Sequence, residues 1–272
     1  MKISKRFFSA PFVAFMICGT IIPALVIAYY GFTDRSGLFT LANLEAIATG
    51  EHAKALGLSL LLALASTVIC LLLAFPLGLA LRGSKLGKKG FMVFVFILPM
   101  WMNFLLRTMA WQVLLEKNGI INGLLTGIGL PALNIINTPA AVILGMVYDY
   151  LPFMVLPIYN AIIKIYNNLI EAAYDLGASK AIVLRKVIIP LSIPGIVSGV
   201  TMVFVPSLTT FAISNMLGGG KVNLIGNIIE QEFTASSNWN LGSGLSLVMM
   251  IFIVISMAFI EKFDRNGEGN MI

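Results

Sequence analysis

Six long apolar runs, separated by short polar segments, dominate the chain. Each is close to the length that an α-helix needs to cross a bilayer, about 20 apolar residues. Their approximate ranges are 7–32, 56–81, 91–115, 139–165, 191–217 and 243–260. This pattern predicts six transmembrane helices and therefore an all-α membrane protein.

The first apolar run follows a basic start at Lys2, Lys5 and Arg6. A signal peptide has the same order of basic and apolar residues. This run is longer than the apolar part of a signal peptide, and no small-residue cleavage site closes it. We therefore expect an uncleaved transmembrane helix.

The composition agrees with a bilayer as the solvent for these runs. Apolar residues make up 58% of the sequence and charged residues 11%, whereas a soluble domain carries about a quarter charged residues. Cys18 and Cys70 lie inside apolar runs, so they say little about the redox compartment. We expect no metal site, because the single histidine, His52, stands in a loop.

The positions of the basic residues indicate why the chain has a net charge of +6. They collect in alternate connecting segments, as the positive-inside rule requires, so we do not expect nucleic-acid binding. Both termini are expected in the cytoplasm, in a multi-pass protein of the cell membrane. The cytoplasmic side then holds Lys2, Lys5, Arg6, Arg82, Lys85, Lys88, Lys89, Lys164, Lys180, Arg185, Lys186, Lys262 and Arg265, and the other side holds Arg35, Lys54, Lys117 and Lys221.

Some connecting segments carry expectations of their own. Residues 116–138 are apolar enough for a short interfacial helix, residues 218–242 form an outer loop, and residues 261–272 form a polar tail. Pro194 and Pro206 are expected to break the fifth run, because proline removes a helical hydrogen bond.

The longest polar interruption in the middle of the chain covers residues 169–190, in a connection that the charge distribution places in the cytoplasm. Leu169, Ala172, Ala173 and Leu176 recur at helical spacing. They predict one small apolar face about two turns long. Alanines on such a face allow the backbone of a partner to approach closely.

This helix is expected to end in a tight turn. Glu171 is expected in its first turn, where a carboxylate is favoured by the helix dipole, and Gly177 can take the positive φ that ends a helix. A second helical run is predicted at residues 179–188, and Pro190 then opens the fifth apolar run. On the residues alone, this helix-turn-helix either docks against a partner protein or rests on lipid headgroups.

The same residues resemble the EAA motif of permease subunits in ABC importers. The pattern is Glu-Ala-Ala, three residues, Gly, nine residues and Val-Ile-Ile-Pro, where the family usually ends in Ile-x-Leu-Pro. In that family the loop is a coupling helix that docks in a groove of the ATP-hydrolysing subunit. The resemblance implies this role for Glu171, Ala172, Ala173, Gly177, Ala178, Arg185 and Pro190.

Three further segments resemble the permeases of polyamine importers. They are Pro99–Thr108, Val147–Tyr159, and Met216–Gly220 followed by Leu224–Asn227. The resemblance implies the six-helix permease fold of type I ABC importers. The expected division is a first transmembrane helix and outer loop at 1–54, a five-helix permease core at 55–260 with the coupling loop at 169–190, and a cytoplasmic tail at 261–272.

The resemblance also implies partners. They are a second permease subunit in a heterodimer, two cytoplasmic ATPase subunits and an extracytoplasmic polyamine-binding protein, all around a core held in membrane lipid. The sequence contains no G-x-x-x-x-G-K-[ST] phosphate loop and no credible Ser/His/Asp set. We therefore expect a transport subunit that is not an enzyme and binds no cofactor, with ATP and Mg²⁺ held by the partner ATPase.

Two ionisable residues stand inside apolar runs, where charges are costly and are candidates for function. They are Arg107 and Asp149, and Tyr148 and Tyr150 flank the carboxylate. In one interpretation, Asp149 and the two rings receive a polycation through an ion pair and cation–π contacts. In a second, Asp149 and Arg107 neutralise each other inside the bundle, with Arg107 as a structural charge. In a third, Asp149 is exposed at the membrane interface.

Other residues of the runs are candidates for the substrate path. Trp101 and Trp111 are alternatively belt anchors or packing residues, and the hydroxyls after Pro206 alternatively satisfy backbone carbonyls that this proline frees. Glu116 is alternatively a solvated loop acid. The full candidate set for the path is Asp149, Tyr148, Tyr150, Trp101, Asn103, Trp111, Glu116, Ser207 and Thr210.

The predicted function is the import of a polyamine such as spermidine or putrescine by alternating access, driven by a separate ATPase. Two alternatives stay open. One is an ABC permease for an inorganic anion such as sulfate, or for iron, in which Arg107 faces the ligand with Asp149 as its partner. The other is a channel or membrane enzyme that has no ATPase.

Overall fold

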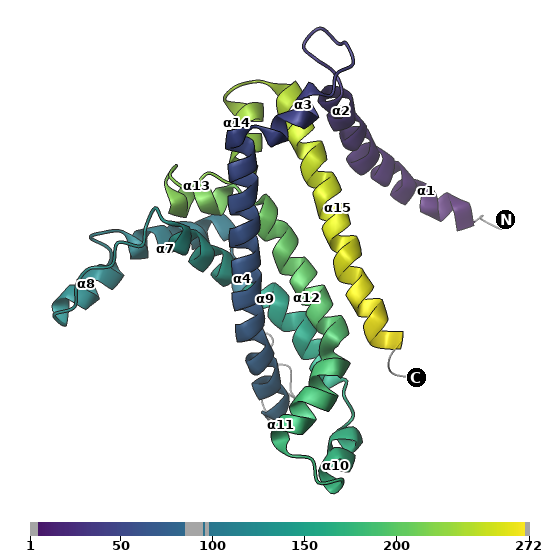
Figure 1. Ribbon diagram of the computed structural model, residues 1–272, viewed down its shortest axis with the longest axis vertical. Coiled ribbons are helices and arrows are strands. Elements are labelled where there is room, and N and C mark those ends of the chain that lie inside the picture. Colours follow the sequence, from purple (N-terminus) through teal and green to yellow (C-terminus); the bar gives the residue numbers. More distant parts are fainter. Residues whose placement is uncertain (1–4, 85–94, 96–97, 270–272) are drawn as a thin grey trace. The chain divides into compact units, whose positions relative to one another are not determined.

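The computed structural model describes residues 5–84, 95 and 98–269, and the regular elements in these ranges are all helices (Figure 1). Helices of adequate length and hydropathy to cross a bilayer cover Pro11–Gly31, Gly50–Gly83, Pro139–Ile163, Lys180–Thr209 and Trp239–Lys262. They confirm five of the six predicted transmembrane runs. The predicted run at 91–115 lies partly outside the described residues.

The described part of that run is interrupted. A 3₁₀ turn at Leu98–Trp101 and helix α7 at Phe104–Leu115 are separated at Met102 and Asn103. The Asn103 side chain accepts a hydrogen bond from the Leu105 backbone N–H at 2.9 Å and so caps α7. Helix α8 follows at Ile120–Gly127 and confirms the short helix predicted in this loop.

The residues group into two units by their contacts, Met1–Lys54 with Ile228–Val254, and Ala55–Asn227 with Ile255–Ile272. We call the first the terminal unit and the second the core unit. The terminal unit contains α1 (Lys5–Met16), a π-helical turn (Ile17–Ile21), α2 (Ile22–Gly31), α3 (Ala42–Glu45) and a 3₁₀ turn (Ala46–Ala48).

In the terminal unit, two asparagines hold the end of α2. The Asn240 side-chain amide donates to the Thr33 carbonyl at 2.7 Å, and the Asn43 amide donates to the same carbonyl at 2.9 Å. A carbonyl oxygen has two lone pairs, so it can accept both bonds. Asn240 belongs to α15 (Trp239–Gly269), so the first turn of that helix is tied to the first transmembrane segment.

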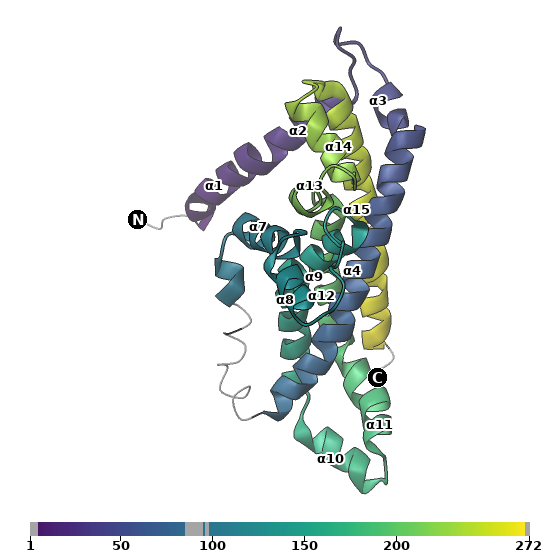
Figure 2. The ribbon, with the colours of Figure 1, turned by 90° about the vertical axis from the view of Figure 1, so that its left-hand side faces the viewer.

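The core unit is organised around α9 (Pro139–Ile163), which lies beside α4 (Gly50–Gly83) and α12 (Ile189–Thr209) in both ribbon views (Figures 1 and 2). One apolar cluster gathers at the beginning of α9 around Val142 and Met146, and a second gathers near its end around Ile158 and Ile162. Helix α9 therefore contributes to both parts of the buried core.

Glycines let α12 approach α9 closely. A Cβ atom added at Gly195 would lie 2.6 Å from the Pro157 carbonyl oxygen, and one at Gly199 would lie 2.7 Å from the Met154 sulfur. Such contacts leave no room for a larger side chain. Small residues spaced by one turn are a common device for helix packing in membranes, because they allow close backbone approach.

Three expectations about the later part of the chain are corrected. Helix α12 contains Pro194 and Pro206 without interruption, and the break comes at Thr210, before α13 (Ala212–Gly218). The predicted outer loop at 218–242 contains α14 (Ile225–Thr234). The predicted tail continues as helix α15 to Gly269.

Candidate coupling loop and buried polar cluster

The connection between α9 and α12 begins with α10 (Asn167–Asp175), which ends in a glycine turn. Gly177 has a φ of +80°, as predicted. Its N–H donates to the Tyr174 carbonyl at 2.8 Å, and the Ala178 N–H donates to the Ala173 carbonyl at 3.0 Å. These two bonds form the Schellman motif, which satisfies the last carbonyls of a helix and favours glycine at the left-handed position.

The surface of α10 is open along its length. Glu171 and Ala172 are exposed, Ala173 is half-buried, and the apolar side chain of Leu176 after the helix is 89% exposed. An apolar residue of this exposure is available to a partner. The expectation that Glu171 lies in the first turn is wrong, because α10 begins at Asn167 and no acid stands in that first turn.

The second half of the loop is continuous with the following span. Helix α11 (Lys180–Val183) passes through a π-helical turn (Leu184–Ile188) directly into α12. Pro190 is the second residue of α12 and follows the π-helical turn, so its missing N–H removes a helical hydrogen bond next to that turn. The predicted separate helix at 179–188 is therefore the start of one long helix, and Arg185 is exposed on its π-helical turn.

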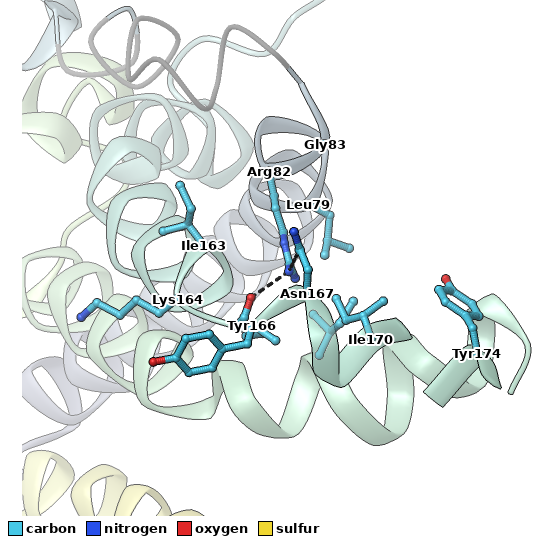
Figure 3. Close-up of a pocket in the computed structure, with 11 residues that line it drawn as sticks. Leu79, Arg82, Gly83, Ile163, Lys164, Tyr166, Asn167, Ile170 and Tyr174 are labelled. Carbon is cyan, nitrogen blue, oxygen red and sulfur yellow. Dashed lines mark hydrogen bonds between the residues drawn. The ribbon is translucent and has the colours of Figure 1, made fainter. Parts of the chain in front are cut away.

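A groove of about 910 Å³ lies between this loop and the ends of α4 and α9 (Figure 3). Arg82, at the end of α4, donates from Nη2 to the Ile165 carbonyl at 2.8 Å and to Asn167 Oδ1 at 2.9 Å. Reasoning from the sequence treated these residues only as basic and polar positions in segments predicted to be cytoplasmic. The groove is lined by Leu79, Arg82, Gly83, Ile163, Lys164, Ile165, Tyr166, Asn167, Ile170, Tyr174 and Ile188.

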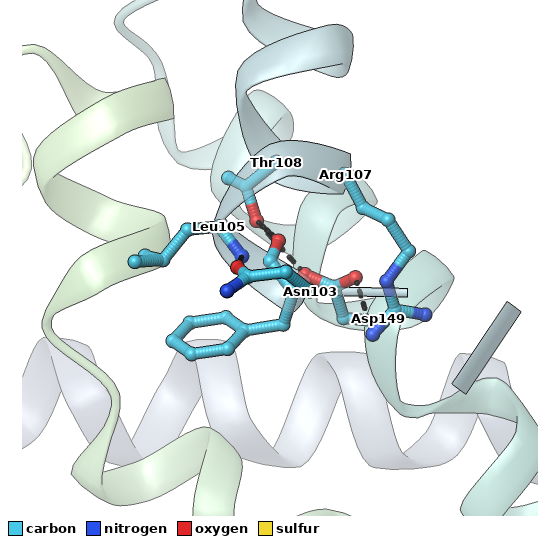
Figure 4. Close-up of polar contacts among 6 residues, drawn as sticks. Asn103, Leu105, Arg107, Thr108 and Asp149 are labelled. Atoms are coloured by element: carbon cyan, nitrogen blue, oxygen red, sulfur yellow. Dashed lines mark hydrogen bonds and ion pairs between the residues drawn. The ribbon is translucent and has the colours of Figure 1, made fainter. Parts of the chain in front are cut away.

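Arg107 and Asp149 form an ion pair between α7 and α9 (Figure 4). Arg107 Nη2 lies 3.3 Å from Asp149 Oδ1, and the side chains are 6% and 2% exposed. The Thr108 hydroxyl donates to Asp149 Oδ2 at 3.0 Å. Arg107 Nε and Nη1 are buried without a hydrogen-bond partner among the described residues. The structural pair considered from the sequence is present in this conformation.

The two tyrosines beside Asp149 have different neighbours. The Arg107 guanidinium carbon, Cζ, lies 5.9 Å from the centre of the Tyr148 ring. The same ring packs edge-on against Trp111, with 5.4 Å between the two ring centres. The Tyr150 hydroxyl donates to the Pro206 carbonyl of α12 at 3.4 Å. Tyr148 therefore contacts the cation of the pair, while Tyr150 links α9 to α12.

The remaining candidates for the path fall into two groups. Trp101 is 74% exposed in its 3₁₀ turn, and Glu116 is exposed at the end of α7. Ser207 and Thr210 are buried at the end of α12, where Ser207 Oγ accepts a bond from Ser66 Oγ at 3.4 Å. Two of these four residues are exposed and two are buried, so the structure does not gather them into one site.

The break at Thr210 is held by Asn227, which reasoning from the sequence missed. The buried Asn227 amide oxygen accepts from Ser214 Oγ at 2.6 Å and from the Leu224 N–H at 2.9 Å. Its amide nitrogen donates to the Phe211 carbonyl at 3.1 Å and to Asn215 Oδ1 at 2.6 Å. One side chain thus satisfies backbone and polar groups freed at the break. No set of metal-binding side chains occurs in the described ranges.

Comparison with known proteins identifies the family. Residues 71–266 match the model of the family described as "Binding-protein-dependent transport system inner membrane component". The chain belongs to this family. The matched segment contains the candidate coupling loop, the Arg107–Asp149 pair and the break at Thr210. The protein is thus a permease, a multi-pass membrane subunit of a transport system and not an enzyme.

The sequences of several named relatives align with nearly the whole length of the permease. It is 35% identical to the spermidine/putrescine transport system permease protein PotB of Haemophilus influenzae, with 94% of this chain and 93% of the relative covered. It is also 35% identical to PotB of Escherichia coli strain K12, with coverage of 93% and 95%. The inner membrane ABC transporter permease protein YdcU of the same strain is 30% identical, with coverage of 90% and 83%.

Solved structures confirm the all-α permease fold. The permease matches a chain of a bacterial ABC transporter that imports the acidic polysaccharide alginate, with a TM-score of 0.82 over 96% of this chain and 94% of that chain. A chain of the MetNI methionine ABC transporter matches with a TM-score of 0.52 over 80% and 94%. Sequence identities of 14% and 19% limit these matches to the fold.

Proposed function

We propose that this permease is the membrane-spanning subunit of an ATP-driven importer of polyamines of the spermidine and putrescine type. The observation that carries the proposal is its 35% identity to spermidine/putrescine permeases over nearly the full length of both chains. Substrate would pass by alternating access, in which the bundle opens first to one side of the membrane and then to the other.

The proposed complex has a second permease, two cytoplasmic ATPase subunits and an extracytoplasmic polyamine-binding protein. The distribution of basic residues supports cytoplasmic termini and a cytoplasmic coupling loop. The open surface of α10 and the exposed Leu176 support docking of that loop on an ATPase. ATP and Mg²⁺ belong to the ATPase in this proposal, and this chain binds no cofactor.

For the buried pair, we propose a structural role in the conformation described. Asp149 is already engaged by Arg107 and Thr108, so a polycation would reach its carboxylate only after the pair opens. The residues proposed for the substrate path are Tyr150, Trp111, Ser207, Thr210, Trp101, Asn103 and Glu116. Their hydroxyls and ring faces suit an organic cation.

One observation favours import of an inorganic anion as a second candidate. Arg107 Nε and Nη1 lack acceptors among the described residues, and an oxyanion could supply them. The Asp149 carboxylate beside them argues against this, because it repels an anion. The polyamine proposal therefore remains the better supported of the two.

The complete importer, rebuilt in liposomes with its ATPase, partner permease and binding protein, tests both candidates. Uptake of radiolabelled spermidine, putrescine and sulfate is measured with and without ATP. ATP-dependent uptake of either polyamine, without sulfate uptake, is expected. Uptake of sulfate without uptake of either polyamine would show that the importer carries an inorganic anion.

A further inference from the structure

Apolar packing does little to fix α10 on the rest of the core unit. Every residue of this helix is exposed or half-buried, and Leu169 and Tyr174 are 49% and 44% exposed. Tyr166, which precedes α10, provides no side-chain cap. A helix with so little buried surface needs polar contacts or chain connections to hold its position.

Arg82 provides such a contact from a different transmembrane helix. Both N–H groups of its Nη2 are used, one on the Ile165 carbonyl just after α9 and one on the Asn167 side chain at the first residue of α10 (Figure 3). The guanidinium stands in the last turn of α4 and beside the end of α9. Cations are favoured at both places, because helix C-termini carry partial negative charge.

The two anchoring ends are themselves firmly packed. Leu81 and Ile165 are 5% and 7% exposed. A Cβ atom at Gly78 would lie 3.2 Å from Ile162 Cδ1, so the last turns of α4 and α9 are in close contact. Arg82 therefore extends from a rigid junction of two helices to the start of a helix that is otherwise open.

We propose that Arg82 is a positioning residue that joins the second transmembrane helix to the coupling helix. A displacement of α10 by an ATPase is then passed to α4 through the guanidinium, as well as along the chain into α9 and α12. This inference rests on the proposed coupling role of α10. Its mechanical basis is a direct, hydrogen-bonded connection between two elements.

The side-chain chemistry explains why arginine suits this position. A guanidinium is planar, so the two N–H groups of Nη2 have fixed directions and hold the carbonyl and the amide oxygen together, while the buried Nη1 has no hydrogen-bond partner among the described residues. A lysine ammonium is a more mobile point charge and holds the same pair less well. Lys164 lines the same groove, and its side chain forms no hydrogen bond or ion pair within the described ranges, so it is a matched control for charge alone.

The experiment uses the complete importer in liposomes with Arg82→Ala, Arg82→Lys, Asn167→Ala and the control Lys164→Ala. Two quantities are measured: spermidine taken up per ATP hydrolysed, and hydrogen exchange of the backbone amides of residues 165–175. Arg82→Ala is expected to speed this exchange and lower the uptake ratio, each by roughly three- to ten-fold, as loss of charge-assisted hydrogen bonds predicts. Arg82→Lys and Asn167→Ala should fall between Arg82→Ala and the wild type, while Lys164→Ala should match the wild type.

Identical results for Arg82→Ala and Lys164→Ala in both measurements overturn the inference. If the Arg82→Ala importer does not assemble, the Asn167→Ala variant tests the inference in its place. Asn167 is exposed, so loss of its side-chain amide should leave the fold intact. Normal uptake by a Gly177→Val importer would instead contradict the proposed coupling role of the loop. Amide exchange in the Arg82 variants does not depend on transport, so the two failures are distinguishable.

Discussion

Arg107 Nη2 and Asp149 Oδ1 lie 3.3 Å apart, in an ion pair that joins α7 to α9 inside the core unit. Breaking a buried pair leaves one charge uncompensated, which typically costs about 3–5 kcal/mol, whereas removing both charges often costs little. We expect Asp149→Leu alone to lower the thermal unfolding temperature strongly. The double variant Arg107→Met with Asp149→Leu should recover most of that loss.

The measurement is thermal unfolding of the detergent-solubilised protein, with exposed Glu116→Gln as the control for loss of an acid. Additive effects of the two single substitutions would show that the pair does not stabilise the fold. Asp149→Asn should be combined with an uptake assay. A well-folded Asp149→Asn protein with weak polyamine uptake would point to contact between this position and the substrate.

Gly177 tests the geometry of the coupling loop. Nothing lies within 4 Å of a Cβ atom at this position, so valine meets backbone strain rather than a clash at a φ of +80°. The strain is on the order of 1–3 kcal/mol and distorts the turn after α10. Gly177→Val should abolish uptake while the protein still inserts into the membrane. An immunoblot of the membrane fraction checks the insertion.

Gly129 is a matched control for that substitution. Its φ is +81°, and the space around its Cβ position is equally open, but it follows α8 in the connection between α7 and α9. Gly129→Val carries the same local strain away from the coupling loop, so uptake should persist. Equal loss of uptake in both variants would attribute the effect of Gly177→Val to general misfolding.

Leu176 tests the exposed face that is proposed to meet an ATPase. A leucine side chain that is 89% exposed has nearly its full apolar surface to bury in a partner, and full burial of a leucine contributes about 1.5–3 kcal/mol. Leu176→Asp should weaken binding of the ATPase about ten-fold in co-purification, since the substitution loses this burial and brings a carboxylate to the interface. Ile128→Asp is the control, because Ile128 is 74% exposed after α8, in a different connection from Leu176. Unchanged co-purification with Leu176→Asp would place the docking surface elsewhere.

Asn227 tests the polar support of the break at Thr210. Alanine at this position removes four hydrogen bonds and leaves buried partners unsatisfied. The expected loss of stability is on the order of 2–4 kcal/mol. Thermal unfolding in detergent measures it, with exposed Asn118→Ala as the control. An unchanged unfolding temperature would mean that the break holds without this side chain.

Local pattern was sufficient for much of the fold. Apolar runs of bilayer length predicted the five described spans, and the loop composition predicted α8. The left-handed turn at Gly177 also followed from local chemistry, since glycine adopts a positive φ at small cost. These features depend on neighbours in the chain, so the sequence by itself determines them.

Tertiary structure decided the features that depend on distant neighbours. Proline suggested breaks at 194 and 206, but the helix continues through both and ends at Thr210, where Asn227 from a later helix satisfies the freed groups. Arg107 and Asp149 were candidates either for a pair or for substrate contact, and only packing of α7 on α9 brings them together. The bonds from Arg82 to the start of α10 had no local signal, because charge alone does not say which backbone carbonyl a guanidinium will reach.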